Sequence, residues 1–110
     1  MQTPLVSIIV PVYNGAGTIE KCLRRIQHQT YSNIEVLVID DGSTDETRTI
    51  CQRFCRQDRR FRLLCQGHLG VAAGRNLAMK QARGQYLQFC DSDDWMTWDA
   101  TETLVQAAIT

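Results

Sequence analysis

Apolar and polar positions alternate along the chain in two different periods, and the changes of period outline the elements. Residues 5–13 read LVSIIVPVY, an almost unbroken apolar and β-branched run that is typical of a strand buried on both faces of a parallel sheet. Residues 34–40, IEVLVID, repeat this pattern. Shorter runs at 61–65 and 84–91 predict a third and a fourth strand.

Segments with helical spacing lie between and after these runs. Four apolar residues recur at the spacing of one helix face: Ile19, Cys22, Leu23 and Ile26. They predict a helix over residues 18–29. Ser43 and Glu46 have the spacing of a capping box, so a second helix is expected to begin at that turn. A small-residue segment at 70–82 and an amphipathic segment after Trp95 predict two more helices.

The resulting order of elements is βαβαβαβ followed by a helix. This order predicts a parallel sheet with right-handed crossovers and helices on both faces. We therefore expect an α/β fold, a three-layer αβα arrangement around a mainly parallel, Rossmann-like sheet. A length of 110 residues, with 44% hydrophobic and 22% charged residues, suits one soluble globular domain or part of one.

The charges of the chain balance, with twelve Lys and Arg against twelve Asp and Glu. No global field would attract nucleic acid, so any electrostatic function must be local. The first apolar run is broken by Ser7 and Pro11, is too short to span a membrane, and follows no basic segment, so we expect a cytoplasmic chain. The basic stretch at 53–62 favours a solvated helix end; contact with lipid headgroups at the inner face of the membrane, or with an acidic acceptor, is the open alternative.

The five cysteines follow neither a metal-site nor a disulfide pattern. Their number is odd, no C-x-x-C spacing occurs, and only two histidines could complete a zinc set. Cys22 and Cys51 fall in phase with apolar neighbours. We interpret them as buried small hydrophobes in a reducing compartment.

Polar residues follow directly after three of the predicted strands. Tyr13 ends the first, Asp40 and Asp41 end the second, and the acidic tetrad 91–94 (DSDD) ends the fourth. The carboxyl ends of parallel strands share one edge of a sheet, where open α/β folds bind their ligands. The carboxylates of the tetrad would repel one another if ionised and unpaired, and Mg²⁺ or Mn²⁺ bridging a diphosphate would remove that repulsion. The alternative is an Asp-rich turn that caps a helix at Thr97.

The remaining candidate residues suggest contacts with the base and with the phosphates of a nucleotide. A helix N-terminus needs one capping acid, so one of Asp40 and Asp41 is spare for a ligand, and a carboxylate accepts from the N–H of a uracil or guanine base. Tyr13 could stack on such a base, with a buried core Tyr as the alternative. Gly70 and Arg75 lie at a predicted helix N-terminus that favours phosphate, with a solvated Arg as the alternative.

Four segments together resemble the family 2 glycosyltransferases with the GT-A fold: VSIIVPVYN, QTYSNIEVLVIDDGSTDET, GVAAGRNLA and GQYLQFCDSDDW. The match spans nearly all of residues 5–95, with the motifs in the family's order and at compatible spacing. The resemblance implies transfer of a sugar from a nucleotide diphosphate sugar, commonly UDP-linked, to a hydroxyl of a glycan, lipid or other acceptor, with inversion at the anomeric carbon.

The resemblance also implies roles for individual residues. The tetrad matches the family's DXD metal motif, with Asp93 as the first candidate for a direct ligand of Mn²⁺ or Mg²⁺, Asp91 towards the ribose and metal, and Asp94 as a second candidate ligand. Asp41, or Asp40 one residue earlier, matches the acid that reads uracil. The residues expected to bind the donor are Pro11, Tyr13, Asn14, Asp40, Asp41, Gly70, Arg75, Asp91 and Ser92.

The sequence departs from the family by ending at Thr110, roughly halfway through a usual family domain. We therefore expect residues 1–110 to form one truncated GT-A domain, the nucleotide-sugar-binding half. The acceptor-binding half and the general base are then expected beyond Thr110, so this segment alone should be inactive. It should also leave an apolar sheet edge uncovered, through which it could self-associate.

Two other functions compete with this prediction. The first is a dinucleotide-binding Rossmann domain, because Gly15 and Gly17 give G-x-G after the first strand, although Glu20 stands where the third glycine belongs. The second is a sugar-nucleotide-binding module without catalytic activity.

Overall fold

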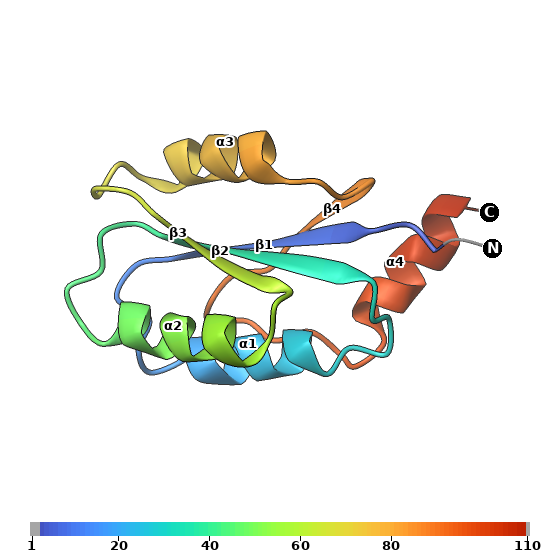
Figure 1. Cartoon of the computed structure of the whole chain (residues 1–110), viewed down its shortest axis with the longest axis horizontal. Coiled ribbons are helices and arrows are strands. Elements are labelled where there is room, and N and C mark those ends of the chain that lie inside the picture. Colours follow the sequence, from blue (N-terminus) through green and yellow to red (C-terminus); the bar gives the residue numbers. More distant parts are fainter. Residues whose placement is uncertain (1–2, 110) are drawn as a thin grey trace.

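The computed structural model describes residues 3–109 and contains the alternating elements that the sequence predicts (Figure 1). In chain order they are β1 (Val6–Val12), α1 (Ile19–Gln27), β2 (Ile34–Asp40), α2 (Thr47–Gln57), β3 (Phe61–Cys65), α3 (Val71–Gln81), β4 (Tyr86–Phe89) and α4 (Ala100–Ile109). No helix within these residues is long and apolar enough to cross a membrane.

The four strands form one parallel sheet in the order β3-β2-β1-β4. The chain runs outward from β1 to β3 and then returns to place β4 on the other side of β1. Helices α1 and α2 cover one face of the sheet and α3 covers the other, while α4 lies beside the sheet near the two termini (Figure 1). The predicted α/β architecture with helices on both faces is confirmed.

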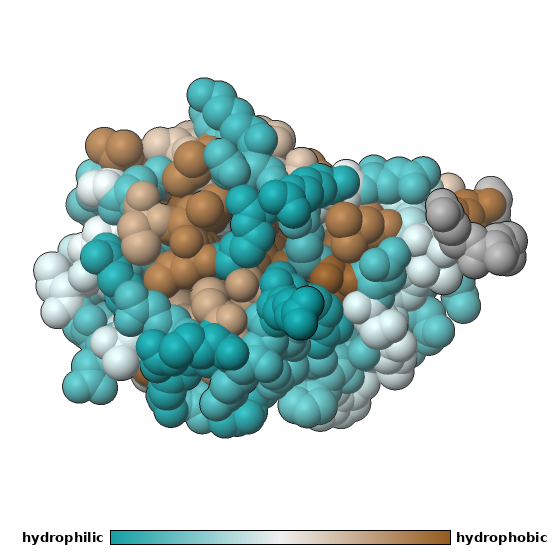
Figure 2. Space-filling model, in the orientation of Figure 1, coloured by the Kyte–Doolittle hydropathy of each residue, from teal (hydrophilic) through white to brown (hydrophobic). Residues whose placement is uncertain are grey.

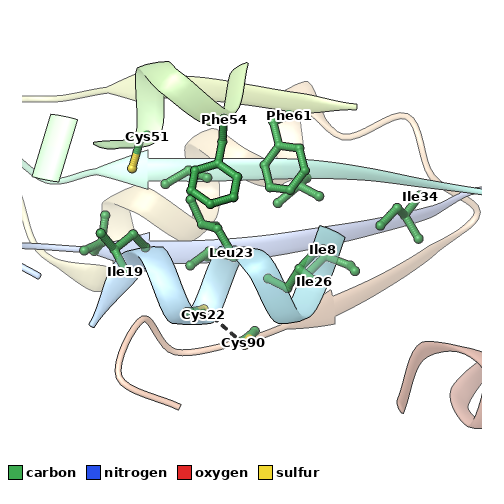
Figure 3. Packing of buried hydrophobic residues seen from close by; sticks show 14 of the residues in the cluster. Ile8, Ile19, Cys22, Leu23, Ile26, Ile34, Cys51, Phe54, Phe61 and Cys90 are labelled. Atoms are coloured by element: carbon green, nitrogen blue, oxygen red, sulfur yellow. Dashed lines mark hydrogen bonds between the residues drawn. The ribbon is translucent and has the colours of Figure 1, made fainter. Parts of the chain in front are cut away.

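The central strands are buried because both of their faces are covered. Every residue of β2 is buried, and in β1 only Pro11 is partly exposed. The larger apolar core lies between the sheet and α1 and α2, where Leu23 and Phe54 pack (Figure 3). The smaller core lies under α3, which approaches closely because Gly74 has no side chain: a Cβ there would lie 3.1 Å from Ile39 Cγ2.

Three of the five cysteines are buried as small apolar residues: Cys22, Cys51 and Cys90. Cys22 and Cys51 are buried in the larger core, as predicted, and all five cysteines are free. The sulfur of Cys22 lies 3.8 Å from that of Cys90 (Figure 3). Burial raises the pKa of Cys51 to about 12, so this thiol stays protonated and unreactive at neutral pH.

One local prediction is wrong, namely the capping box at the start of α2. The N-cap of α2 is Glu46, whose side chain makes no capping hydrogen bond, and the N–H of Thr47 donates instead to Asp45 Oδ1 at 2.9 Å. Ser43 lies outside the helix, where its Oγ accepts a hydrogen bond from the backbone N–H of Asn14 at 2.9 Å. Ser43 and Glu46 have the spacing of a box, but Ser43 instead joins two loops.

The outer strands are less well covered than the central ones. On β4 the alternate residues Leu87 and Phe89 are 39% and 46% exposed. Along the other edge, on the side of β3, an apolar area lies between α3 and α2 with hydrophilic side chains around it (Figure 2). The expectation of an uncovered apolar sheet edge is confirmed within residues 3–109.

Candidate functional site

A pocket of about 380 Å³ lies at the carboxyl edge of the sheet. Its walls come from the end of β1, the residue after β2, the loop after β3, the start of α3 and the acidic tetrad after β4. The strand order reverses between β1 and β4 at this edge, which is where open α/β sheets form their ligand crevice. The structure therefore brings together segments that lie 80 residues apart in the sequence, such as Pro11 and Asp91.

Tyr13 follows β1 and lines the pocket with a side chain that is 47% exposed. The alternative of a buried core tyrosine is wrong. The ring of His68 lies against the Tyr13 ring, with the centroids 4.1 Å apart and the planes tilted by 34°. A flat aromatic surface at the mouth of a polar pocket can stack on a heterocyclic base.

Asn14 and Gly15 also line the pocket, but their polar groups fix the loop. Asn14 has a left-handed backbone (φ 49), and its Oδ1 accepts from the N–H of Thr44 at 2.8 Å. Gly15 N–H donates to Thr47 Oγ1 at 2.9 Å, and a Cβ at Gly15 would lie 2.6 Å from Val12 Cγ2. The loop after β1 is therefore clamped to the loop after β2, which holds Tyr13 in place.

The two adjacent acids after β2 have different roles. Asp40 is fully buried, accepts from Ser43 N–H at 3.1 Å, and pairs with Arg48 Nε at 2.9 Å. Asp40 does not line the pocket, whereas Asp41 does. The acid of this pair that a ligand can reach is therefore Asp41.

Asp41 is held by donors from the loop after β3. Its Oδ1 accepts from Gln66 Nε2 and from Leu69 N–H, both at 2.8 Å, and its Oδ2 accepts from Gly70 N–H at 3.1 Å. These hydrogen bonds, with Gln66 first, lower the pKa of Asp41 below its usual value, so the carboxylate is ionised at neutral pH. Neither acid is free of the chain's own hydrogen-bond donors, and Asp41 is the one that also lines the pocket.

Gly70 and Arg75, both predicted to bind phosphate, lie on different sides of the site. Gly70 lines the pocket as the N-cap of α3, with a φ of 96° that favours glycine. Arg75 does not line this pocket. Its guanidinium lies over the ring of Phe89, 5.3 Å from the centroid, beside a neighbouring pocket of about 330 Å³ that Asp94 and Trp95 also line.

The acidic tetrad carries three exposed carboxylates whose oxygens can all lie within 4.8 Å of one another: Asp91, Asp93 and Asp94. Within residues 3–109 no hydrogen bond or ion pair to these carboxylates is found. Asp91, Ser92 and Asp93 line the pocket at the carboxyl edge, and Asp94 lines the neighbouring one. Hard oxygen ligands at this separation fit Mg²⁺ or Mn²⁺.

The alternative reading of the tetrad as a helix cap is wrong. Helix α4 begins at Ala100, well after the tetrad. The hydroxyl of Thr97 donates to Asp99 Oδ1 at 3.1 Å, so the local turn is closed without any carboxylate of the tetrad.

Sequence reasoning missed two residues of the site, Gln66 and His68. Both hydrogen-bond to Asp41, and Gln66 lines the pocket. They follow the carboxyl end of β3 as the predicted residues follow the ends of β1, β2 and β4. The rule that located the other site residues would have located these if it had been applied to the third strand.

The family model described as Glycosyl transferase family 2 matches residues 7–110. The chain belongs to this family. Among curated relatives it is 43% identical over 106 residues to glycosyltransferase GlyG of Streptococcus pneumoniae serotype 4, a match that covers 96% of this chain. Family membership overturns the dinucleotide-binding alternative.

Two solved structures support the same assignment at the level of the fold. The S. aureus TarS fragment 1-349, in complex with UDP-GlcNAc, superposes with a TM-score of 0.82 at 34% identity over 94% of this chain. The mannosyltransferase PcManGT of Pyrobaculum calidifontis, in complex with GDP-Man and Mn²⁺, gives a TM-score of 0.82 at 33% identity over 97% of this chain. The GT-A assignment is therefore confirmed.

The chain is much shorter than the proteins that it matches. It spans 35% of the length of GlyG, 30% of the TarS fragment and 32% of PcManGT.

Proposed function

We propose that the pocket at the carboxyl edge binds a nucleotide diphosphate sugar, and that the whole protein transfers the sugar to a hydroxyl acceptor with inversion. One observation carries the proposal: a single pocket joins an aromatic ring, an ionised carboxylate and a cluster of acids, contributed by Tyr13, Asp41 and the tetrad. These groups match, in turn, a base ring, a base N–H and a metal-bound diphosphate.

The base end of the donor is proposed to lie between Tyr13 and Asp41. The ring of Tyr13 would stack on the base, and Asp41 would accept its N–H. Uracil and guanine both carry such an N–H, and the two structural neighbours hold UDP-GlcNAc and GDP-Man respectively. We take a UDP-linked sugar as the donor of this chain, on the strength of the sequence resemblance.

The diphosphate end is proposed to lie between the tetrad and the start of α3. Asp93 and Asp91 would hold Mn²⁺ or Mg²⁺, with Asp94 as a further ligand; PcManGT was solved with Mn²⁺. The metal would neutralise charge on the departing diphosphate as a Lewis acid. Gly70 allows the backbone and the N-terminus of α3 to approach a phosphate closely.

The acceptor side is proposed to be built largely by chain beyond Thr110. Within residues 3–109, the only acids that line the pocket are Asp41, Asp91 and Asp93, and each already has a donor-binding role here. The general base would then come from another part of the protein, and the 110-residue segment alone would bind donor without transferring it. We place the protein in the cytoplasm, where a glycan or lipid acceptor could bring it to the inner face of the membrane.

Calorimetric titration tests the proposal against its rivals. UDP is expected to bind in the micromolar to millimolar range with Mn²⁺ present, and NAD is expected not to bind. A chelator should abolish UDP binding, because the carboxylates of the tetrad would then repel the diphosphate. Absence of UDP binding at any metal concentration would refute the proposal.

A further inference from the structure

The imidazole of His68 makes the two contacts that are proposed for the base of the donor. Its ring lies on Tyr13, with centroids 4.1 Å apart. Its Nδ1 lies 3.1 Å from Asp41 Oδ2 and 3.2 Å from the Asp41 backbone oxygen. Because both neighbours are acceptors, Nδ1 carries the hydrogen and donates it. A flat nitrogen heterocycle of this chain therefore lies against the tyrosine ring, tilted by 34°, and donates to the carboxylate.

The Asp41 carboxylate has room for only one further hydrogen-bond donor, and His68 lies at that position. Oδ1 already accepts from Gln66 Nε2, from Leu69 N–H and, at 3.2 Å, from Gly70 N–H. Oδ2 accepts from Gly70 N–H and faces the imidazole. A carboxylate oxygen has about two lone-pair directions, so a base N–H can reach Asp41 only at Oδ2.

The backbone of His68 is held by its neighbours, whereas its side chain is largely exposed. The backbone packs against Gly42, where an added Cβ would lie 2.9 Å from His68 N, and the next two residues are bonded to Asp41. The side chain itself is 62% exposed. An exposed ring held by one hydrogen bond and one stacking contact can leave for solvent at small cost.

We propose that His68 occupies the base subsite of the donor-free protein and that the base of the donor displaces it, so that this side chain sets donor affinity. The inference rests on the proposed function, because it takes the base subsite from there. Binding of UDP then exchanges one stacked, hydrogen-bonded ring for another. Because the contacts of His68 must be broken first, UDP binds more weakly than Tyr13 and Asp41 alone would allow.

The variant His68→Ala tests this competition directly. With Mn²⁺ present, it should bind UDP about three- to tenfold more tightly than the unchanged chain, because no ring has to leave the subsite. Binding of inorganic pyrophosphate should not change, since it does not reach the base subsite. His28→Ala is the matched control: His28 lies at the other end of α1 from the pocket, with Nδ1 3.0 Å from the Arg24 backbone oxygen, and its removal should leave both affinities unchanged.

Weaker or unchanged UDP binding by His68→Ala would overturn the inference, because His68 would then support the base or not touch it. Proton NMR gives a second readout, since the chain has only two histidines. Adding UDP should shift the ring signals of His68 towards free-imidazole values and leave those of His28 in place; unmoved His68 signals would also overturn it. Failure of the unchanged chain to bind UDP would instead refute the proposed function itself.

Discussion

Asp41 and Asp93 line the same pocket, yet the structure surrounds their carboxylates in opposite ways. Asp41 accepts hydrogen bonds from Gln66, Leu69 and Gly70, and its pKa is lowered by them. Asp93 is exposed, and within residues 3–109 its carboxylate has no hydrogen bond or ion pair, although those of Asp91 and Asp94 are close by. The base end of the pocket is thus organised by the chain itself, and the phosphate end requires a partner of opposite charge.

Because of this difference, we expect substitutions of the two acids to affect folding stability and ligand binding differently. Removing an acid that the chain has already paired should cost folding energy, because its donors lose their partner. Removing one of three unpaired acids should relieve repulsion and leave folding intact. Binding should respond in the reverse order, with the greatest loss at the tetrad.

The largest expected effect concerns catalysis, because we propose that neither end of the pocket contributes the general base. The 110-residue chain, given UDP-sugars, Mn²⁺ and mixed hydroxyl acceptors, should transfer sugar no faster than it is lost to water. General base catalysis alone contributes roughly 10²- to 10⁴-fold, and acceptor positioning contributes more. The assay follows labelled sugar. Transfer that disappears in Glu102→Gln would show that this segment contains its own base.

The next effect concerns Asp41, the acid after β2 that lines the pocket. Asp41→Asn should weaken UDP binding about tenfold or more, because a charged acceptor of the base N–H is lost, and should leave pyrophosphate binding unchanged. Calorimetry with both ligands measures this. Equal losses for UDP and pyrophosphate would dismiss the base-reading role of Asp41.

Asp40→Ala should affect folding rather than recognition of the ligand. Asp40 is fully buried and bonded to Ser43 and Arg48, so its loss should lower the free energy of unfolding by about 1–3 kcal/mol. Asp93→Ala should leave that free energy unchanged. Urea denaturation of the two variants compares them, and equal stabilities would contradict the distinction between a paired and an unpaired acid.

The smallest expected effect is on the stability of the folded chain at acid pH. Because the pKa of Asp41 is lower in the folded chain than its usual value of 3.8, the stabilisation is fully present above that value and is lost as pH falls through the lower, folded pKa. Asp45, bonded to Thr47, behaves in the same way. Asp41→Asn should therefore flatten the pH dependence of unfolding below pH 3.8, and an unchanged slope would contradict this linkage.

The sequence was enough to predict the sheet and the edge that carries the site. Residues 34–40 form a strand with the predicted bounds, because a mainly apolar and β-branched run of that length is typical of a strand buried on both faces of a parallel sheet. The carboxyl ends of parallel strands then bring Tyr13, Asp41 and the tetrad to one edge regardless of the details of the loops. The pocket confirms that these residues lie together at one edge of the sheet.

The sequence did not predict which of two neighbouring residues points into the pocket. Asp40 points towards α2 and Arg48, and Asp41, one residue on, points into the pocket, because neighbouring residues at a strand end face opposite sides. At the start of α3, the N-cap Gly70 and the helical residues Val71 and Gly74 line the pocket. Arg75 is a further 100° around the helix and points towards Phe89. Gln66 and His68 follow the carboxyl end of β3, and they were missed because the strand-end rule was applied only to the other three strands.

The most direct test of the central claim is the metal dependence of UDP binding in Asp93→Ala, with Asp99→Ala as the matched control, since Asp99 is an exposed acid that does not line the pocket. The control should bind UDP in Mn²⁺ as the unchanged chain does. Asp93→Ala should remain folded and show no increase in UDP affinity when Mn²⁺ replaces chelator. Binding of UDP that is the same in Asp93→Ala and in the control, with and without Mn²⁺, would contradict a metal-held diphosphate at the tetrad.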